Sequence, residues 1–133
     1  MLYLETSAFL KLVLDEVHSE PLRAAVAHKT AWSSSLLGLE AHRSARRLGV
    51  AAGVVDAFLC AITLITISET TMLNARTVGG DDLRTLDAMH LAAALELGTD
   101  LEAVLTYDVR LARACRSAEV SVLTPGMPDH WYV

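Results

Sequence analysis

The sequence predicts an α/β fold in which helices cover both faces of a parallel sheet. Short apolar or β-branched runs alternate along the chain with stretches at helical spacing, a pattern typical of parallel sheets. The opening run, 1–4, has no polar break, as expected of a strand buried on both faces. A long helix, expected from Leu83 to Gly98, is apolar nearly all round, which indicates that it is buried or packed on two sides.

Length and composition suit a single domain in the cytoplasm. The chain has 133 residues, of which 53% are hydrophobic, enough for a core, and we expect one domain, 1–133. Cys60 and Cys115 lie far apart and fit no metal-ligand spacing, so we expect both to be reduced thiols in the core. No signal peptide is recognised, and the most apolar stretch, 54–67, is too short to cross a bilayer.

The net charge of -5 argues against a protein that coats nucleic acid, which would be basic. It does not exclude a nuclease, because acidic metal ligands themselves make the net charge negative. Two local groups of arginines can give two-point contacts to phosphate or carboxylate, although a solvated helix face is the simpler interpretation of each group. These groups are Arg43, Arg46 and Arg47, and Arg110, Arg113 and Arg116.

In the first half of the chain, strands are expected at 1–4, 30–34 and 62–67. Thr6 and Ser7 can cap a helix at about 8–14, and Pro21 suits the first turn of the next helix. A third helix is expected from the serines at 33–35 to about Leu48, where Gly49 ends it. By composition, 51–61 is a fourth helix.

In the second half, a helix at 69–78 closes at two glycines and precedes the long helix. A strand at 102–106 is followed, after Asp108, by a helix to about Ser117, and a last strand is expected at 119–123. Pro125, Gly126 and Pro128 then indicate an irregular tail.

Four acidic residues are placed at one edge of this sheet. Glu5 ends the first strand, Glu40 lies one to two turns into the helix after the second, Asp87 is in the first turn of the long helix, and Asp108 follows the fourth strand. Ligands of parallel sheets gather at the carboxyl ends of the strands. Converging carboxylates repel one another unless a cation neutralises them, and hard oxygen ligands without cysteine favour Mg²⁺ or Mn²⁺. A water activated at such a metal can attack a phosphodiester.

Each acidic residue also has a simpler interpretation. Asp108 can cap its helix, the helix dipole favours Asp87 in a first turn, and Glu40 can pair with Arg43 or Arg47. A glutamate that ends an apolar strand has no such local role. On the same helix as Asp87, His90 is more often a core histidine with satisfied hydrogen bonds than a base or ligand.

Four segments resemble the PIN-domain ribonucleases, specifically the VapC-type toxins of toxin–antitoxin pairs. They are LYLETSAFLKLV, SSLLGLEAHRSARR, LRTLDAMHLAAAL and LTYDVRLARA. The resemblance implies a three-layer α/β/α sandwich with a parallel sheet of four to five strands, metal-dependent RNA cleavage and a cognate VapB-like antitoxin. It assigns metal or catalytic roles to Glu5, Glu40, Asp87 and Asp108, with the Thr106 and Ser7 hydroxyls in support.

One departure from the family pattern concerns the first acid, which is ordinarily aspartate and here is Glu5. The extra methylene moves the carboxylate outward, and Mg²⁺ demands near-ideal octahedral geometry. Because a misplacement of about 1 Å can cost about a hundredfold in rate, two functions stay open. They are an active endoribonuclease toxin and a weak or inactive PIN-fold module that binds an antitoxin-like partner.

Further expectations concern substrate, partners and a more distant alternative. In the nuclease, Arg43, Arg47 or Arg110 would hold flanking RNA phosphates. The apolar early helices would leave a groove for an amphipathic partner helix. This groove would be lined by Phe9, Leu10, Leu12, Val13, Leu22 and Val26. A second copy of the chain is another partner that the sequence leaves open, whereas Glu5 argues against a phosphatase, which needs a nucleophilic aspartate.

Overall fold

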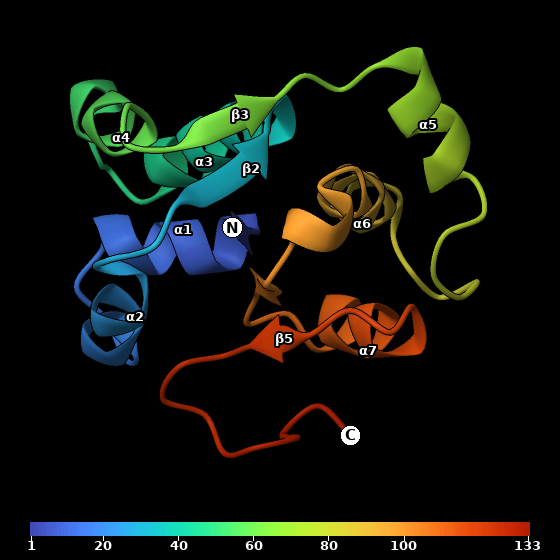
Figure 1. The fold of residues 1–133 in the computed structure, drawn as a ribbon. Helices are drawn as coiled ribbons and strands as arrows, with labels where there is room; N and C mark the ends of the chain where they lie inside the picture. Colours follow the sequence, from blue (N-terminus) through green and yellow to red (C-terminus); the bar gives the residue numbers. More distant parts are fainter.

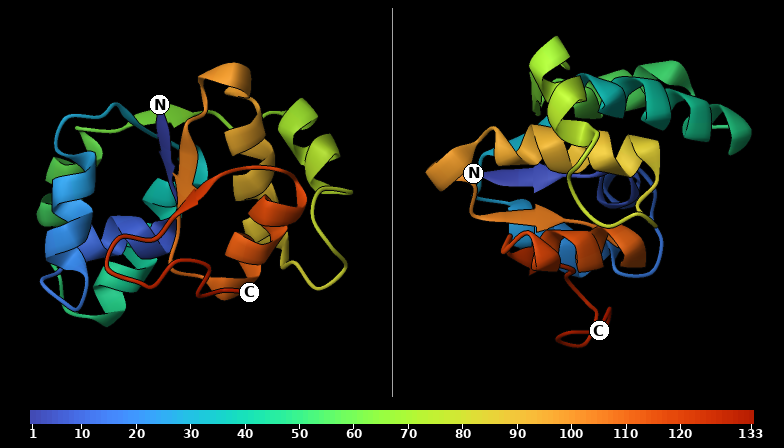
Figure 2. Two further views of the ribbon diagram at one scale, coloured as in Figure 1. Left: turned by 60° about the horizontal axis from the view of Figure 1, so that its bottom comes forward. Right: turned by 90° about the vertical axis from the view of Figure 1, so that its right-hand side faces the viewer.

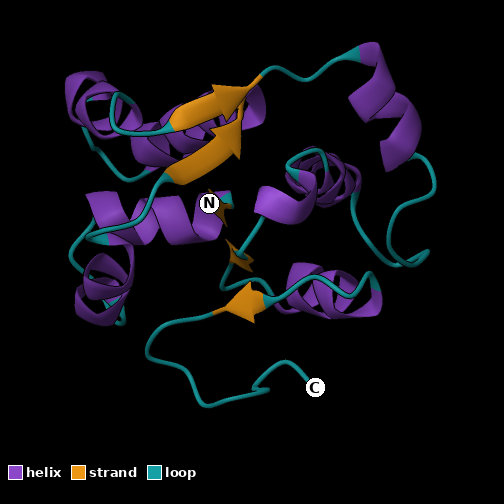
Figure 3. Cartoon of the chain, in the orientation of Figure 1, coloured by secondary structure: helices purple, strands orange, loops and turns teal.

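The computed structural model describes all 133 residues and contains one five-stranded sheet. The strand order is β3-β2-β1-β4-β5, and every neighbouring pair is parallel (Figure 3). The strands are β1 (Leu2–Leu4), β2 (Ala31–Ser34), β3 (Thr63–Ile65), β4 (Ala103–Leu105) and β5 (Val122–Leu123). The expected parallel sheet is therefore confirmed, with β1 at its centre and the short strands β3 and β5 at its edges.

Helices cover both faces of this sheet. They are α1 (Thr6–Val13), α2 (Ser19–Val26), α3 (Ser35–Arg47), α4 (Ala52–Leu59), α5 (Glu69–Ala75), α6 (Thr85–Leu95) and α7 (Val109–Ser117), with a short 3₁₀ turn at Gly98–Asp100. In Figures 1 and 2, α1 to α4 gather on one side of the strands and α5 to α7 on the other. This arrangement confirms the α/β/α architecture.

The core lies on both faces of β1. On one face, Tyr3 packs with buried residues of α6 and α7, including Leu91 and Leu111. On the other face, Leu2 and Leu4 pack with residues of α1 and α2 such as Ala8 and Leu22. All three residues of β1 are buried, as the unbroken apolar run predicts.

Two expectations about α6 and the cysteines need correction. The helix spans 85–95 rather than 83–98, and Leu86 and Leu95 are 46% and 40% exposed, so its apolar surface is not fully covered. Cys115 is buried, but Cys60 is exposed. Cys60 follows the last residue of α4, a helix in which only Val55 is buried, and so it lies beyond the face that contacts the core.

Two of the six apolar side chains expected to line a groove on the early helices are not available for it. Phe9 and Leu22 are fully buried, and the other four apolar side chains proposed to line it are half-buried. Phe9 packs with α3 and α4, which close over α1. A groove for a partner helix stays a prediction, with Leu10, Leu12, Val13 and Val26 as its remaining lining. None of the helices combines the length and apolar character needed to cross a membrane.

Candidate metal site and its hydrogen-bond network

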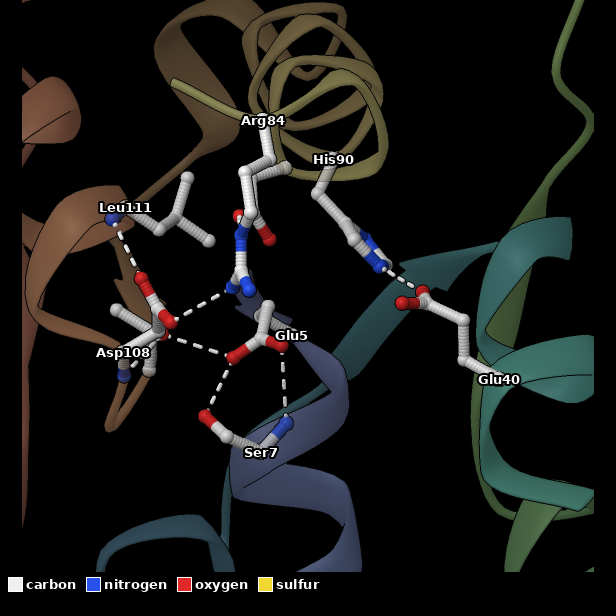
Figure 4. Close-up of polar contacts among 9 residues, drawn as sticks. Glu5, Ser7, Glu40, Arg84, His90, Asp108 and Leu111 are labelled. Atoms are coloured by element: carbon white, nitrogen blue, oxygen red, sulfur yellow. Dashed lines mark hydrogen bonds and ion pairs between the residues drawn. The ribbon is translucent and has the colours of Figure 1, made fainter. Parts of the chain in front are cut away.

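Three of the four predicted acids meet at the carboxyl edge of the sheet. Glu5 follows β1, Asp108 follows β4, and Asp87 lies in the first turn of α6. Because β1 pairs with β4, the residues that follow these two strands are neighbours in space. Figure 4 shows the Arg84 guanidinium pointing down from α6, with the Asp108 carboxylate beside it and the Glu5 carboxylate below it.

The Glu5 carboxylate is held by three donors. The Ser7 amide donates to Oε1 at 3.0 Å, the Ser7 hydroxyl donates to Oε2, and the Thr106 hydroxyl donates to Oε2 at 2.8 Å. Burial raises the pKa of Glu5 above its ordinary value, and the hydrogen bonds from Ser7 and Thr106 act against that rise. Glu5 is also the N-cap of α1, which begins at Thr6 rather than near Ala8. The expectations that Glu5 has no local role and that Thr6 or Ser7 caps this helix were therefore wrong.

Ser7 and Thr106 also connect the two strand ends. The Tyr107 amide donates to the Ser7 hydroxyl at 2.8 Å, and the Asp108 amide donates to the Thr106 hydroxyl at 3.0 Å. Both hydroxyls thus lie against the Glu5 carboxylate and link it to the residues that follow β4. The Asp108 side chain caps α7 through Oδ1, which accepts from the Leu111 amide at 2.9 Å, and leaves Oδ2 for the site.

Arg84 is a site residue that sequence reasoning missed. Its Nε donates to Asp87 Oδ2 at 3.0 Å, and its Nη2 donates to Asp108 Oδ2 at 3.1 Å. Burial and the nearby charge of Asp108 raise the pKa of Asp87, and the hydrogen bond from Arg84 opposes that rise. The spacing of three residues between Arg84 and Asp87 is a signal for such a pair, but nothing local indicates the second contact, to Asp108.

Glu40 lies in a separate network beside the other acids. His90 Nε2 and Glu40 Oε1 are 2.5 Å apart, and the Thr6 hydroxyl donates to the same oxygen at 2.9 Å. Although burial acts to raise it, the hydrogen bonds from His90 and Thr6 and the charge of His90 hold the pKa of Glu40 below its ordinary value. The expected pairing of Glu40 with Arg43 or Arg47 was wrong, because neither arginine forms an ion pair with it.

His90 is a buried histidine with both ring nitrogens engaged. A hydrogen bond of 2.8 Å joins its Nδ1 to the Tyr3 hydroxyl, while its Nε2 faces Glu40. This agrees with the interpretation of a satisfied core histidine, and it adds a consequence: the core orients the ring that holds Glu40.

Tyr3→Phe should therefore destabilise the protein more than an ordinary loss of a hydroxyl. It leaves the buried Nδ1 of His90 without a partner, which costs about 1–3 kcal/mol. Tyr107→Phe is the matched control, since its hydroxyl bonds the Pro125 carbonyl at 2.7 Å in a half-buried position, where the cost should be about 1 kcal/mol or less. Urea unfolding of both variants measures the difference, and equal losses would contradict the orienting role of Tyr3.

The arginines expected to bind phosphate are all exposed. Arg43, Arg46 and Arg47 line a hollow on α3 together with Leu39 and His42. No acidic side chain pairs with these three arginines or with Arg110, which lies two residues beyond Asp108. Their charges are therefore free to contact an anion from solvent.

The acids match a divalent cation in ligand type. Glu5, Asp87 and Asp108 offer carboxylate oxygens and no sulfur, the donors that Mg²⁺ and Mn²⁺ prefer. As the side chains stand, no group of three histidines, cysteines or acids is arranged to hold a metal ion. The positive charge between Asp87 and Asp108 is supplied by Arg84, so a metal at this place requires that guanidinium to move.

Comparison with known proteins gives consistent matches. The family description of the PIN domain matches residues 2–117. Ribonuclease VapC47 of Mycobacterium tuberculosis is 33% identical over 95% of this chain and 98% of its own length. Ribonuclease VapC35 of the same species is 35% identical over 95% of this chain and 98% of its own length. Ribonuclease VapC46, also of Mycobacterium tuberculosis, is 33% identical over 93% of this chain and 97% of its own length.

Proposed function

Because this chain belongs to the PIN-domain family, we propose that it is a metal-dependent endoribonuclease and the toxin of a type II toxin–antitoxin pair. The observation that carries the proposal is that Glu5 and Asp108 follow two paired strands at one edge of the sheet, where Arg84 joins Asp108 to Asp87. The ribonuclease names of relatives that align over nearly their whole length support the same activity. We propose that the whole chain, 1–133, acts as one domain in the cytoplasm, where RNA is available.

In this proposal Glu5, Asp87 and Asp108 hold the metal. Bound Mg²⁺ or Mn²⁺ supplies a Lewis acid for phosphate oxygens and lowers the pKa of water. Ser7 and Thr106 fix the Glu5 carboxylate by hydrogen bonds, so its orientation is set before a substrate arrives. Glu40, fixed by His90 and Thr6, completes the acidic site from the side of α3 and keeps its charge because its pKa is lowered.

The proposed activity is tested by incubating the purified, antitoxin-free chain with a pool of structured RNAs. The expected result is cleavage in Mg²⁺ or Mn²⁺ and none in chelator. Accessible bases make single-stranded loops the expected targets.

Arg43, Arg47 and Arg110 are proposed to hold flanking phosphates. Arg43 and Arg47 lie one and two turns beyond Glu40 on α3, so an RNA strand leaving the acidic site can follow the exposed side of this helix. Arg110, two residues after Asp108 at the start of α7, would contact the strand on the other side in this proposal.

Reversing the charge of Arg43 and Arg47 together should weaken RNA binding about tenfold at low salt and flatten its salt dependence by about 0.7 per lost phosphate contact. The measurement is fluorescence anisotropy with single-stranded RNA in chelator, where no cleavage occurs. The matched control reverses Arg23 and Lys29, which pair with Asp15 and Glu102 away from the site. An equal effect in the control would mean that only net charge matters.

A second candidate function is a weak or inactive PIN-fold module that holds an antitoxin-like partner. The observation that favours it is Glu5, the departure from the family's aspartate. Both functions include a VapB-like antitoxin as partner, and either is compatible with a homodimer. Tight binding of Mg²⁺ or Mn²⁺ separates the two, because only the nuclease requires it.

A further inference from the structure

Arg84 is the one basic side chain that joins two of the acids assigned to the metal. Arg84 is the N-cap residue of α6, but its side chain forms no capping hydrogen bond with that helix. Its guanidinium instead bonds both Asp87 and Asp108, and Asp108 lies 24 positions after Arg84 in the chain. Both contacts end on Oδ2 atoms, and the other Asp108 oxygen is engaged in capping α7. The guanidinium therefore takes up one carboxylate oxygen of Asp87 and the Asp108 oxygen that does not cap α7.

We propose that Arg84 competes with the divalent cation for the Oδ2 atoms of Asp87 and Asp108 and thereby sets the metal affinity of the site. This inference rests on the proposed metal-dependent function. A guanidinium and a divalent cation repel each other, so each weakens the binding of the other at these two oxygens. Release of Arg84 is cheap because its side chain is already 59% exposed and can turn into water.

The same contact explains how the metal-free site tolerates its charges. Asp87 is nearly buried, with its pKa raised by burial and by Asp108, and the Arg84 hydrogen bond counters both effects. Arg84 thus keeps the two aspartates close together before the cation binds. Removing it should have two opposite results, which are a less stable metal-free protein and a tighter metal complex.

The test is a calorimetric titration of metal-free protein with Mn²⁺. Arg84→Gln removes both ion pairs that compete with the metal, and such pairs are individually weak. Mn²⁺ binding should therefore become tighter by about tenfold, which corresponds to about 1.4 kcal/mol. Arg84→Lys keeps the charge but loses the two-point fork, and should fall between the wild type and Arg84→Gln. In parallel, Tm without metal should fall in Arg84→Gln, and the rise of Tm on adding Mn²⁺ should be larger than in wild type.

Arg110→Gln is the matched control. It removes one positive charge near Asp108 without removing a contact to it, and should change Mn²⁺ affinity less than about threefold. Unchanged or weaker Mn²⁺ binding in Arg84→Gln, with normal binding in wild type, would overturn this inference and leave the metal site standing. An equal gain of Mn²⁺ affinity in Arg110→Gln would mean that only the net charge of the protein matters, and would also overturn this inference. Absence of Mn²⁺ binding in every variant would overturn the proposed metal function together with this inference.

Discussion

Asp87→Asn is expected to reduce RNA cleavage at least about a hundredfold, the scale of a disrupted site geometry. Asp87 is one of the two carboxylates that Arg84 joins, and an amide is a poor ligand for Mg²⁺ beside two remaining acids. The measurement is the single-turnover cleavage rate of a structured RNA at saturating Mg²⁺.

The fold of this variant should survive. The pKa of Asp87 is raised, which means that folding disfavours its charged form, so a neutral amide of the same shape should not lower stability near neutral pH. The control is Asp81→Asn, an exposed acid in the loop before α6, for which an unchanged rate is expected. Full activity of Asp87→Asn would contradict the assigned site.

Glu5→Asp is expected to lower cleavage by about a hundredfold as well, because the carboxylate is displaced by about one bond length and loses one of its hydrogen-bond partners. The shorter side chain can still reach the Ser7 amide as an N-cap. It withdraws from the Thr106 hydroxyl, which now bonds Glu5 at 2.8 Å from the neighbouring strand end. The cleavage rate and Mn²⁺ affinity of the variant measure the effect.

Glu20→Asp, a change of the same kind at an exposed position in the first turn of α2, is the control and should have no effect on cleavage. A rise in cleavage in Glu5→Asp would show that the glutamate impairs the site. That outcome would favour the binding module over the nuclease.

The parts of the site that follow from strand order were open to prediction. Glu5 and Asp108 come directly after buried apolar strands, and parallel pairing of β1 with β4 brings such ends together. The contacts that were missed depend on tertiary structure. Arg84 contacts Asp108 only because the fold brings the start of α6 close to the residue that follows Tyr107 after β4. Glu40 bonds His90, which is 50 positions away in the chain, instead of the arginines that follow it on α3.

The same limit explains the errors in the fold. Local pattern identifies an apolar face but does not tell which element covers it. All six apolar side chains of the early helices were expected to line a free groove, yet Phe9 of α1 is buried against α3 and α4. Conversely, Cys60 sits in an apolar stretch and is nevertheless exposed, because α4 contacts the core mainly through Val55.

The most direct test of the central claim, that the acids at this sheet edge form a metal site, is a titration of metal-free wild type and Asp87→Asn with Mn²⁺. The account predicts binding in wild type that is lost or greatly weakened in Asp87→Asn, together with RNA cleavage that stops in chelator. Equal Mn²⁺ binding by both proteins, or no binding by either at millimolar Mn²⁺, would contradict it.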